Sequence, residues 1–382
     1  MNNKLEICNG MKIICASSVS FGREAFSSLG SCEFPAEGDI CPEMVATADA
    51  VITRSKTKLN ADLLGESTVR FAGTCTAGVD HVDLEALETR SIHFASAPGC
   101  NANGVSEYVL AALLEKPGFS FAGKTVGIIG HGQVGTRVEK KLRALGCKVL
   151  LNDPPKEAGG ADGPYTSLSE MLPLCDVVTL HVPLVERGDF PTRDLLGAAQ
   201  IASMKQGAIL INACRGEVLD AAAVIKARGS SALSWLVLDV WDPEPQIPED
   251  LLVASDLATP HIAGHSVEGK VNGTRQIREQ LVEFFKLDVA SWDPEPLMPA
   301  PEHQEVDISG LSHRDQRLAK MVKACYDIRS DDQALREAKD DRAASFVQQR
   351  RNYRNRREFA ATRLVGVPEE EVEVFRSLGF QI

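Results

Sequence analysis

Several features that would point to other classes of protein are missing from this 382-residue sequence. It has no apolar run near the roughly 18 residues of a membrane helix, and residues 1–10 lack the apolar core of a signal peptide, so we expect a cytoplasmic protein without a membrane partner. Basic residues are not in surplus: the formal net charge is −12, which argues against nucleic acid as a partner. The ten cysteines form neither a Cys-x-x-Cys pair nor a Cys/His metal spacing, so we expect reduced packing residues and no metal site.

The length and the 44% hydrophobic content predict two or three domains with sizeable cores. Short apolar runs that alternate with helical patterns predict an α/β protein with two doubly wound parallel sheets, of the flavodoxin and Rossmann types. We expect a discontinuous substrate domain (11–105 and 264–287), a dinucleotide-binding domain (106–263), and a linker with a small C-terminal α+β domain (288–382).

Residues 123–155 carry the clearest local motif in the chain. An apolar strand ends in Gly-His-Gly-Gln-Val-Gly, an amphipathic helix follows, and a second strand ends at Asp153. Glycines at these positions allow a tight turn, close approach of a pyrophosphate and close helix packing. The motif therefore predicts dinucleotide contacts from Gly130, Gly132, Gln133, Val134 and Gly135.

Acidic Asp153 also indicates which dinucleotide is bound. A carboxylate there accepts hydrogen bonds from a ribose 2′-hydroxyl and repels a 2′-phosphate, and two prolines rather than an arginine follow it. NAD is therefore the expected cofactor. Val182 and Asp239 end later strands of the same pattern, where we expect them to contact the adenosine and the nicotinamide end.

Three further apolar runs, within residues 209–220, 235–245 and 256–265, each lead into a polar residue. Arg215, Glu244 and His261 should meet because the carboxyl ends of parallel strands open onto one crevice. A guanidinium binds a carboxylate bidentately, an imidazole takes a hydroxyl proton, and a carboxylate orients the imidazole. Each of these three residues alone could have a purely structural role. Their occurrence in the order Arg, Glu, His after successive strands predicts an active site.

Other candidates rest on weaker patterns. Ser55 and Thr76 follow predicted strands and either face a ligand or cap turns. Six arginines lie between residues 341 and 359, and if this segment is helical, Arg350, Arg354 and Arg357 share one face. They serve either as a solvated or dimer face, or as a phosphate site together with Arg54 or Lys56.

The order of the dinucleotide motif, INACRG, LDVWDPEP and TPHIAG resembles the D-2-hydroxyacid dehydrogenase family. The likeness is nearest to its branch that acts on 4-phospho-D-erythronate, through ITRSKTKLN, FAGTCTAGVDHVD, SAPGCNANGVSEYV and the tail pieces YDIRSDD and RRNYRNRREF. The resemblance implies NAD-dependent oxidation of this small phosphorylated 2-hydroxy acid, in vitamin B6 synthesis, by a homodimer joined partly through the C-terminal domain.

Position by position, the resemblance implies substrate contacts for Ser55 and Thr76, an NAD contact for Gly264, and catalysis by the predicted Arg-Glu-His triad. Two positions depart from the branch: His265 replaces a usual substrate-contacting tyrosine, and Val182 a frequent threonine. Two alternatives stay open. One is a dehydrogenase of another acid such as 3-phosphoglycerate or glyoxylate, and the other is an NAD(H)-sensing binding protein.

Overall fold

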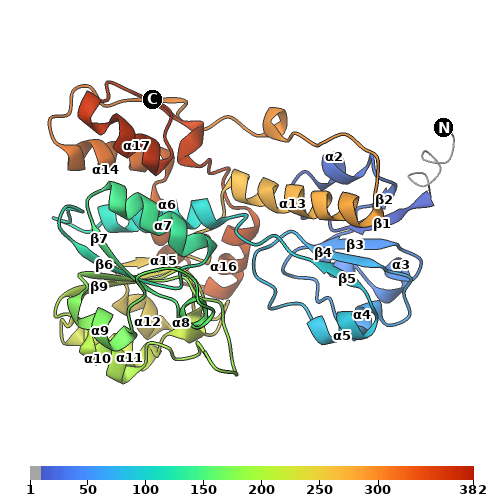
Figure 1. Ribbon diagram of the computed structural model, residues 1–382, viewed down its shortest axis with the longest axis horizontal. Coiled ribbons are helices and arrows are strands. Elements are labelled where there is room, and N and C mark those ends of the chain that lie inside the picture. Colours follow the sequence, from blue (N-terminus) through green and yellow to red (C-terminus); the bar gives the residue numbers. More distant parts are fainter. Residues whose placement is uncertain (1–9) are drawn as a thin grey trace. The chain divides into compact units, whose positions relative to one another are not determined.

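The computed structural model describes residues 10–382, which divide into two compact units. The first unit holds the described residues up to Asn101 and Ser266–Pro299, and the second holds Ala102–His265 and Ala300–Ile382. Each unit contains a parallel sheet with helices on both faces (Figure 1), which confirms the predicted α/β class. Among the described residues, no helix is both long and apolar enough to cross a membrane.

The first unit is a five-stranded sheet in the order β2-β1-β3-β4-β5, with every pair of neighbours parallel. This is the flavodoxin-like order. Its strands are β1 (Lys12–Cys15), β2 (Ser31–Glu33), β3 (Ala50–Thr53), β4 (Phe71–Thr74) and β5 (His93–Ala95). Its helices are α2 (Gly22–Phe26), α3 (Pro42–Val45), α4 (Ala61–Leu64), α5 (Leu84–Thr89) and α13 (Val267–Phe285). All residues of β3 and β4 are buried, as expected for parallel strands covered on both faces.

The second unit is a six-stranded parallel sheet in the order β11-β10-β9-β8-β6-β7. Its strands are β6 (Thr125–Ile129), β7 (Lys148–Asn152), β8 (Val177–Leu180), β9 (Ala208–Asn212), β10 (Leu233–Leu238) and β11 (Leu257–Ala258). A single parallel bridge from Leu151 to Tyr165 stands where the third strand of a Rossmann sheet would lie. The strand order reverses between β6 and β8, which is the point where such sheets bind ligands.

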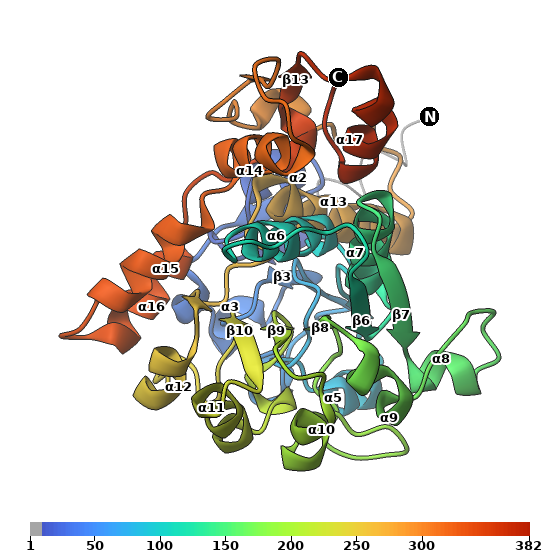
Figure 2. The same ribbon diagram turned by 90° about the vertical axis from the view of Figure 1, so that its left-hand side faces the viewer.

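Helices cover both faces of this sheet (Figure 2). They are α6 (Ala102–Leu114), α7 (Gln133–Ala144), α8 (Pro154–Ala158), α9 (Leu168–Met171), α10 (Ala198–Ser203), α11 (Ala221–Gly229) and α12 (Glu249–Ala254). Helix α6 is buried along almost its whole length because the sheet lies on one side of it and helix α14 (Arg314–Cys325) packs on the other. Its sequence is accordingly mostly apolar, although Ser106 and Glu107 are also buried.

The C-terminal segment is small and mixes helices with strands, as predicted. Besides α14 it contains α15 (Ile328–Glu337), α16 (Arg342–Arg351), α17 (Val372–Leu378) and the parallel pair β12 (Glu305–Asp307) and β13 (Arg363–Val365). It packs against the rest of the second unit through polar contacts as well as apolar ones. The Lys141 ammonium of α7 donates to the Leu378 carbonyl at 2.5 Å, and the Asp332 carboxylate accepts from the Ala258 amide of β11 at 2.8 Å.

The arginine-rich segment is not helical throughout, so the condition for one shared arginine face is not met. Helix α16 ends at Arg351, so Arg354 and Arg357 lie beyond it and do not share a helix face with Arg350. The guanidinium of Arg354 instead donates to the Asp327 carbonyl at 2.9 Å and to the Asp331 carboxylate at 3.2 Å.

Candidate active site

The predicted catalytic side chains all follow strands of the six-stranded sheet. Arg215 comes after β9, Glu244 after β10 and His261 after β11, and these three strands are parallel neighbours. The strand expectations for residues 209–220, 235–245 and 256–265 are confirmed. The three loops therefore leave the same edge of the sheet.

Glu244 and His261 form a directly bonded pair. Nδ1 of His261 lies 2.9 Å from Oε2 of Glu244, and the other carboxylate oxygen accepts the Trp241 amide at 3.0 Å. Burial raises the pKa of Glu244, but the hydrogen bond and charge of His261, the charge of Arg350 and the Trp241 amide together outweigh burial, so this pKa lies below its ordinary value. An ionised Glu244 must receive a proton from Nδ1, which leaves Nε2 as the proton acceptor of a neutral ring.

Buried Asp239 shapes the loop that carries His261. Its carboxylate accepts from the Thr259 hydroxyl at 2.6 Å and from the amides of Ile262 and Ala263 at 2.7 and 2.9 Å. The His261 amide donates to the Asp239 carbonyl at 2.7 Å, and His261 adopts φ 56°. A left-handed conformation at a non-glycine residue costs roughly 1–2 kcal/mol. The Asp239 hydrogen bonds hold this strained residue in place.

The Arg215 loop lies directly against the loop that leads to Glu244. A Cβ on Gly216 would stand 2.1 Å from the carbonyl carbon of Trp241, so only glycine permits this approach of two backbones. Asn212 shapes the same loop, since its amide donates to the Arg215 carbonyl at 2.8 Å and its Oδ1 accepts from the Cys214 amide at 3.1 Å. Sequence reasoning did not single out Asn212 or Gly216, although both lie inside the INACRG motif.

The glycine loop after β6 has the geometry that a dinucleotide requires. Gly130 adopts φ 90° beside the His181 carbonyl, and a Cβ on Gly135 would stand 2.1 Å from the Gly130 oxygen. Within the described part of the chain, a Cβ on Gly132 would meet nothing within 4 Å, and no side chain caps the amino end of α7, which begins after Gly132. The open amides at this helix start suit a pyrophosphate, so these residues fit NAD. Gln133 and Val134 are the first residues of α7.

Asp153 is the first residue after β7. This strand pairs with β6, which leads into the glycine loop. The Asp153 carboxylate accepts from the His131 amide at 2.8 Å and from the Lys156 amide at 3.2 Å. Each oxygen of an ionised carboxylate has a second lone pair, so it can still accept from a ribose hydroxyl. The ammonium of Lys156 is bonded to the His131 carbonyl. This lysine is a basic group near Asp153 that sequence reasoning did not weigh.

Other predicted cofactor and substrate residues of the second unit lie close to these loops. The nearest atoms to a Cβ on Gly130 include the Val182 side chain, at 2.9 Å. Gly264 and His265 follow the Asp239-bonded segment, and the His265 ring meets the Tyr353 ring edge to face with centroids 5.8 Å apart. Their roles toward NAD or substrate stay predictions.

Ser55 and Thr76 belong to the first unit. Ser55 is exposed two residues after β3, and Thr76 follows β4, where its hydroxyl donates to the Gly78 carbonyl at 2.8 Å. One oxygen of Glu37 accepts from the amides of Arg54 and Lys56, at 3.2 and 3.1 Å, and so shapes the loop around Ser55. Substrate contact by Ser55 and Thr76 stays a prediction.

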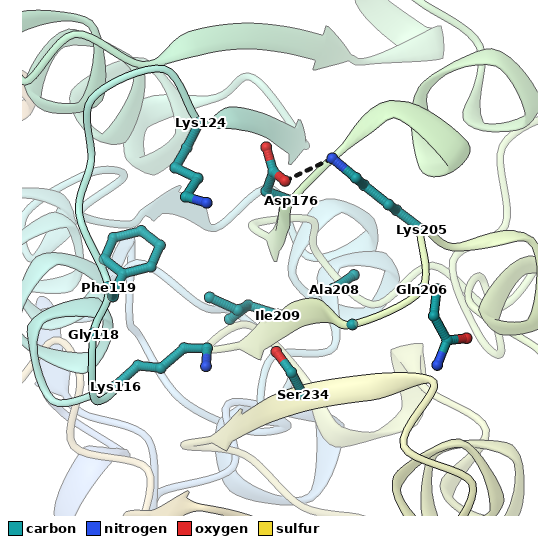
Figure 3. Close-up of a pocket in the computed structure, with 11 residues that line it drawn as sticks. Lys116, Gly118, Phe119, Lys124, Asp176, Lys205, Gln206, Ala208, Ile209 and Ser234 are labelled. Carbon is teal, nitrogen blue, oxygen red and sulfur yellow. Dashed lines mark hydrogen bonds and ion pairs between the residues drawn. The ribbon is translucent and has the colours of Figure 1, made fainter.

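The pocket in Figure 3 is not this site. It is lined by side chains at the amino-terminal ends of the strands, such as Asp176 before β8 and Ile209 near the start of β9. Arg215, Glu244 and His261 follow the opposite, carboxyl-terminal ends. Lys205, which also lines the pocket, lies 2.7 Å from Asp176, so this ion pair partly neutralises the pocket.

Comparisons with known proteins agree with this geometry. Residues 106–263 match the NAD-binding domain of D-isomer specific 2-hydroxyacid dehydrogenases, and residues 297–379 match a domain of unknown function, DUF3410. The chain is 39% identical to an erythronate-4-phosphate dehydrogenase of Pectobacterium carotovorum, over 97% of this chain and 98% of that protein. A Klebsiella pneumoniae enzyme with the same name is 40% identical, with the same coverage.

Solved structures show the same fold. The NAD⁺-bound 3-phosphoglycerate dehydrogenase of Entamoeba histolytica aligns with a TM-score of 0.61 at 25% identity, over 73% of this chain and 96% of that one. The D-lactate dehydrogenase of Aquifex aeolicus, complexed with NAD and lactic acid, gives a TM-score of 0.57 at 25% identity, over 72% and 94%. The chain belongs to the erythronate-4-phosphate dehydrogenases, a branch of the NAD-dependent D-isomer specific 2-hydroxyacid dehydrogenase family.

Proposed function

We propose that this protein oxidises C2 of 4-phospho-D-erythronate to give 2-oxo-3-hydroxy-4-phosphobutanoate, a step toward pyridoxal 5′-phosphate. The observation that carries the chemistry is the 2.9 Å contact between His261 Nδ1 and Glu244 Oε2, on the sheet edge that also presents Arg215. The substrate is supported by the near-full-length likeness to enzymes named for it, which extends through the C-terminal segment.

The roles of the residues follow from their protonation. Nε2 of neutral His261 accepts the proton of the C2 hydroxyl, and the Glu244 carboxylate stabilises the imidazolium that forms. The guanidinium of Arg215 binds the substrate carboxylate and sets C2 in place. Bound NAD supplies the hydride acceptor, held by Gly130, Gly132 and the other predicted residues of the glycine loop, with Asp153 on its ribose. Ser55, Thr76 and His265 are proposed substrate contacts.

The roles of the three parts of the chain are also a proposal. Residues 106–263 would bind the dinucleotide, residues 11–105 and 264–287 the substrate, and residues 288–382 would join two copies into a homodimer. Light scattering of the purified protein tests the last point, and a mass equal to one chain at working concentration would contradict it.

A turnover assay tests the substrate. We expect kcat/KM for 4-phosphoerythronate to exceed the values for 3-phosphoglycerate and glyoxylate by about 10²-fold or more, since each charge-assisted hydrogen bond that a wrong substrate loses is worth roughly 1.5–3 kcal/mol. Comparable values for all three would contradict the assignment. NAD binding without turnover of any of them would favour an NAD(H)-sensing protein.

A further inference from the structure

The C-terminal segment reaches the predicted catalytic pair within one chain. Arg350, in the last turn of α16, places Nη1 4.0 Å from Oε2 of Glu244. The same oxygen bonds Nδ1 of His261 at 2.9 Å. Arg350 and Glu244 are 32% and 21% exposed, so water screens this ion pair only partly. The carboxylate is thus held by the imidazole, by the Trp241 amide and by a cation from the C-terminal segment.

Helix α16 is anchored strongly enough to place Arg350. The Phe346 ring, one turn earlier, is 1% exposed in an apolar core of the second unit, and the Arg350 guanidinium lies over that ring at 5.7 Å from its centroid. The Asp341 carboxylate caps the helix through the Ala344 amide at 3.0 Å. Figure 2 shows α16 beside α15.

The neighbouring helix is bonded to the strand that precedes His261. Asp332 of α15 accepts the Ala258 amide of β11 at 2.8 Å and also binds Arg336 at 2.8 Å. Arg336 in turn donates to the carbonyls of Leu252 and Ser255 at 2.9 Å each. Gln349 of α16 donates to the Ala334 carbonyl of α15 at 3.1 Å, so the segment that presents Arg350 and the loop that presents His261 are parts of one hydrogen-bonded assembly.

We propose that Arg350 is a positioning residue for the Glu244–His261 pair, so that the domain matched as DUF3410 completes the active site of its own chain. This inference rests on the proposed function of that pair. Arg350 orients the carboxylate toward Nδ1 and keeps it ionised. It also adds a positive charge near the imidazole, which opposes formation of the imidazolium.

The charges around His261 give the direction in which replacing Arg350 should shift the pH dependence of kcat/KM. The Glu244 carboxylate contacts the imidazole directly, and the buried Asp239 carboxylate binds the amides of the two residues that follow His261. Arg350 opposes protonation from across Glu244, and Arg215 presents a second cation from the neighbouring loop. Removing Arg350 therefore makes His261 easier to protonate. Hydroxyl oxidation needs the neutral ring, so the acid limb of the kcat/KM profile should move to higher pH.

The test compares Arg350→Gln, Arg350→Lys and the control Arg351→Gln in the full-length protein. Arg351 is the next residue of the same helix and is exposed. We expect Arg350→Gln to lower kcat about 10-fold. The acid limb should move up by about 0.5–1 pH unit, which is a modest part of the pKa shift that a charge within 4–6 Å produces. Arg350→Lys should restore the acid limb, and Arg351→Gln should match wild type in both measurements.

Two outcomes would overturn the proposal. An unchanged acid limb in Arg350→Gln would show that Arg350 does not act through the Glu244–His261 pair. A loss of kcat/KM confined to 4-phosphoerythronate, with erythronate unaffected, would make Arg350 a phosphate ligand instead. Equal losses on both substrates are expected for a positioning residue.

A second readout separates this proposal from the proposed function. The chain has eight histidines, and in a ¹³C-histidine NMR titration of the protein the His261 signal is the one lost in His261→Ala. Its titration midpoint should rise in Arg350→Gln and not in Arg351→Gln, whether or not any substrate of the assay is turned over. An unchanged midpoint contradicts the positioning role, whereas absent turnover with a shifted midpoint contradicts only the substrate assignment.

Discussion

Replacing Glu244 with Gln tests the catalytic geometry most directly, because the two carboxylate oxygens accept from two different donors. Oε2 faces His261 Nδ1 at 2.9 Å and Oε1 faces the Trp241 amide at 3.0 Å. Glutamine has one acceptor oxygen and one NH₂ group. It cannot serve both donors, so either the imidazole or the backbone amide must face an NH₂ group.

The substitution has two energetic consequences. The imidazolium formed during the reaction loses a charge-assisted hydrogen bond, worth roughly 1.5–3 kcal/mol, and a partly buried donor left without an acceptor costs roughly 1–3 kcal/mol. The lost charge-assisted bond raises the barrier by about 1.5–3 kcal/mol, or roughly 10–10²-fold in rate, whereas the unpaired donor also destabilises the resting enzyme and does not add to the barrier. We expect the loss in kcat, with NAD affinity nearly unchanged, because Glu244 supports a charge that appears only during the reaction.

The assay is steady-state formation of NADH from 4-phosphoerythronate, with NAD affinity measured separately by fluorescence. Glu373→Gln is a matched control, since Glu373 lies on α17 with its side chain 82% exposed. A Glu244→Gln variant that keeps more than about a tenth of wild-type kcat would refute the reasoning, because even one lost charge-assisted bond costs more than that.

Three further predictions address other parts of the chain. Asp153→Ala should lower the ratio of kcat/KM with NAD to that with NADP, since it removes the charge that opposes a 2′-phosphate beside Lys156; an unchanged ratio would show that other residues select the cofactor. Arg215→Lys should cost on the order of 2–4 kcal/mol in kcat/KM because an ammonium lacks the bidentate fork, and a loss under threefold would rule out a carboxylate clamp. Buried Glu107 accepts the Phe359 amide through Oε1, while Oε2 has no hydrogen-bond partner among residues 10–382. Burial, and then the nearby Glu358 carboxylate, raise the pKa of Glu107. A carboxyl with a raised folded-state pKa stabilises the fold at low pH and loses that contribution as pH rises, so Glu107→Gln should raise Tm increasingly between about pH 5 and pH 9; a Tm difference that is the same at both ends would contradict this.

The sequence alone determined the strand ends and the cofactor loop. Buried parallel strands appear as short apolar runs, and a polar residue after such a run must lie at the carboxyl edge of the sheet. For this reason the sequence predicts that Arg215, Glu244 and His261 lie together. The glycine motif was equally local, because Gly130 and Gly135 meet steric requirements within one strand, turn and helix.

Only the tertiary structure decided what partners these groups have. Sequence placed Asp239 at a strand end, but the fold buries it to 1% exposure, where its carboxylate shapes the His261 loop. Gly216 is required by a backbone from another loop, a contact that no local pattern encodes. The contact between Arg350 and Glu244 joins residues 106 positions apart, and it depends on the burial of Phe346 and the end of α16 at Arg351. Such contacts arise when segments far apart in the sequence pack together. The spacing of residues along the chain carries no information about this packing.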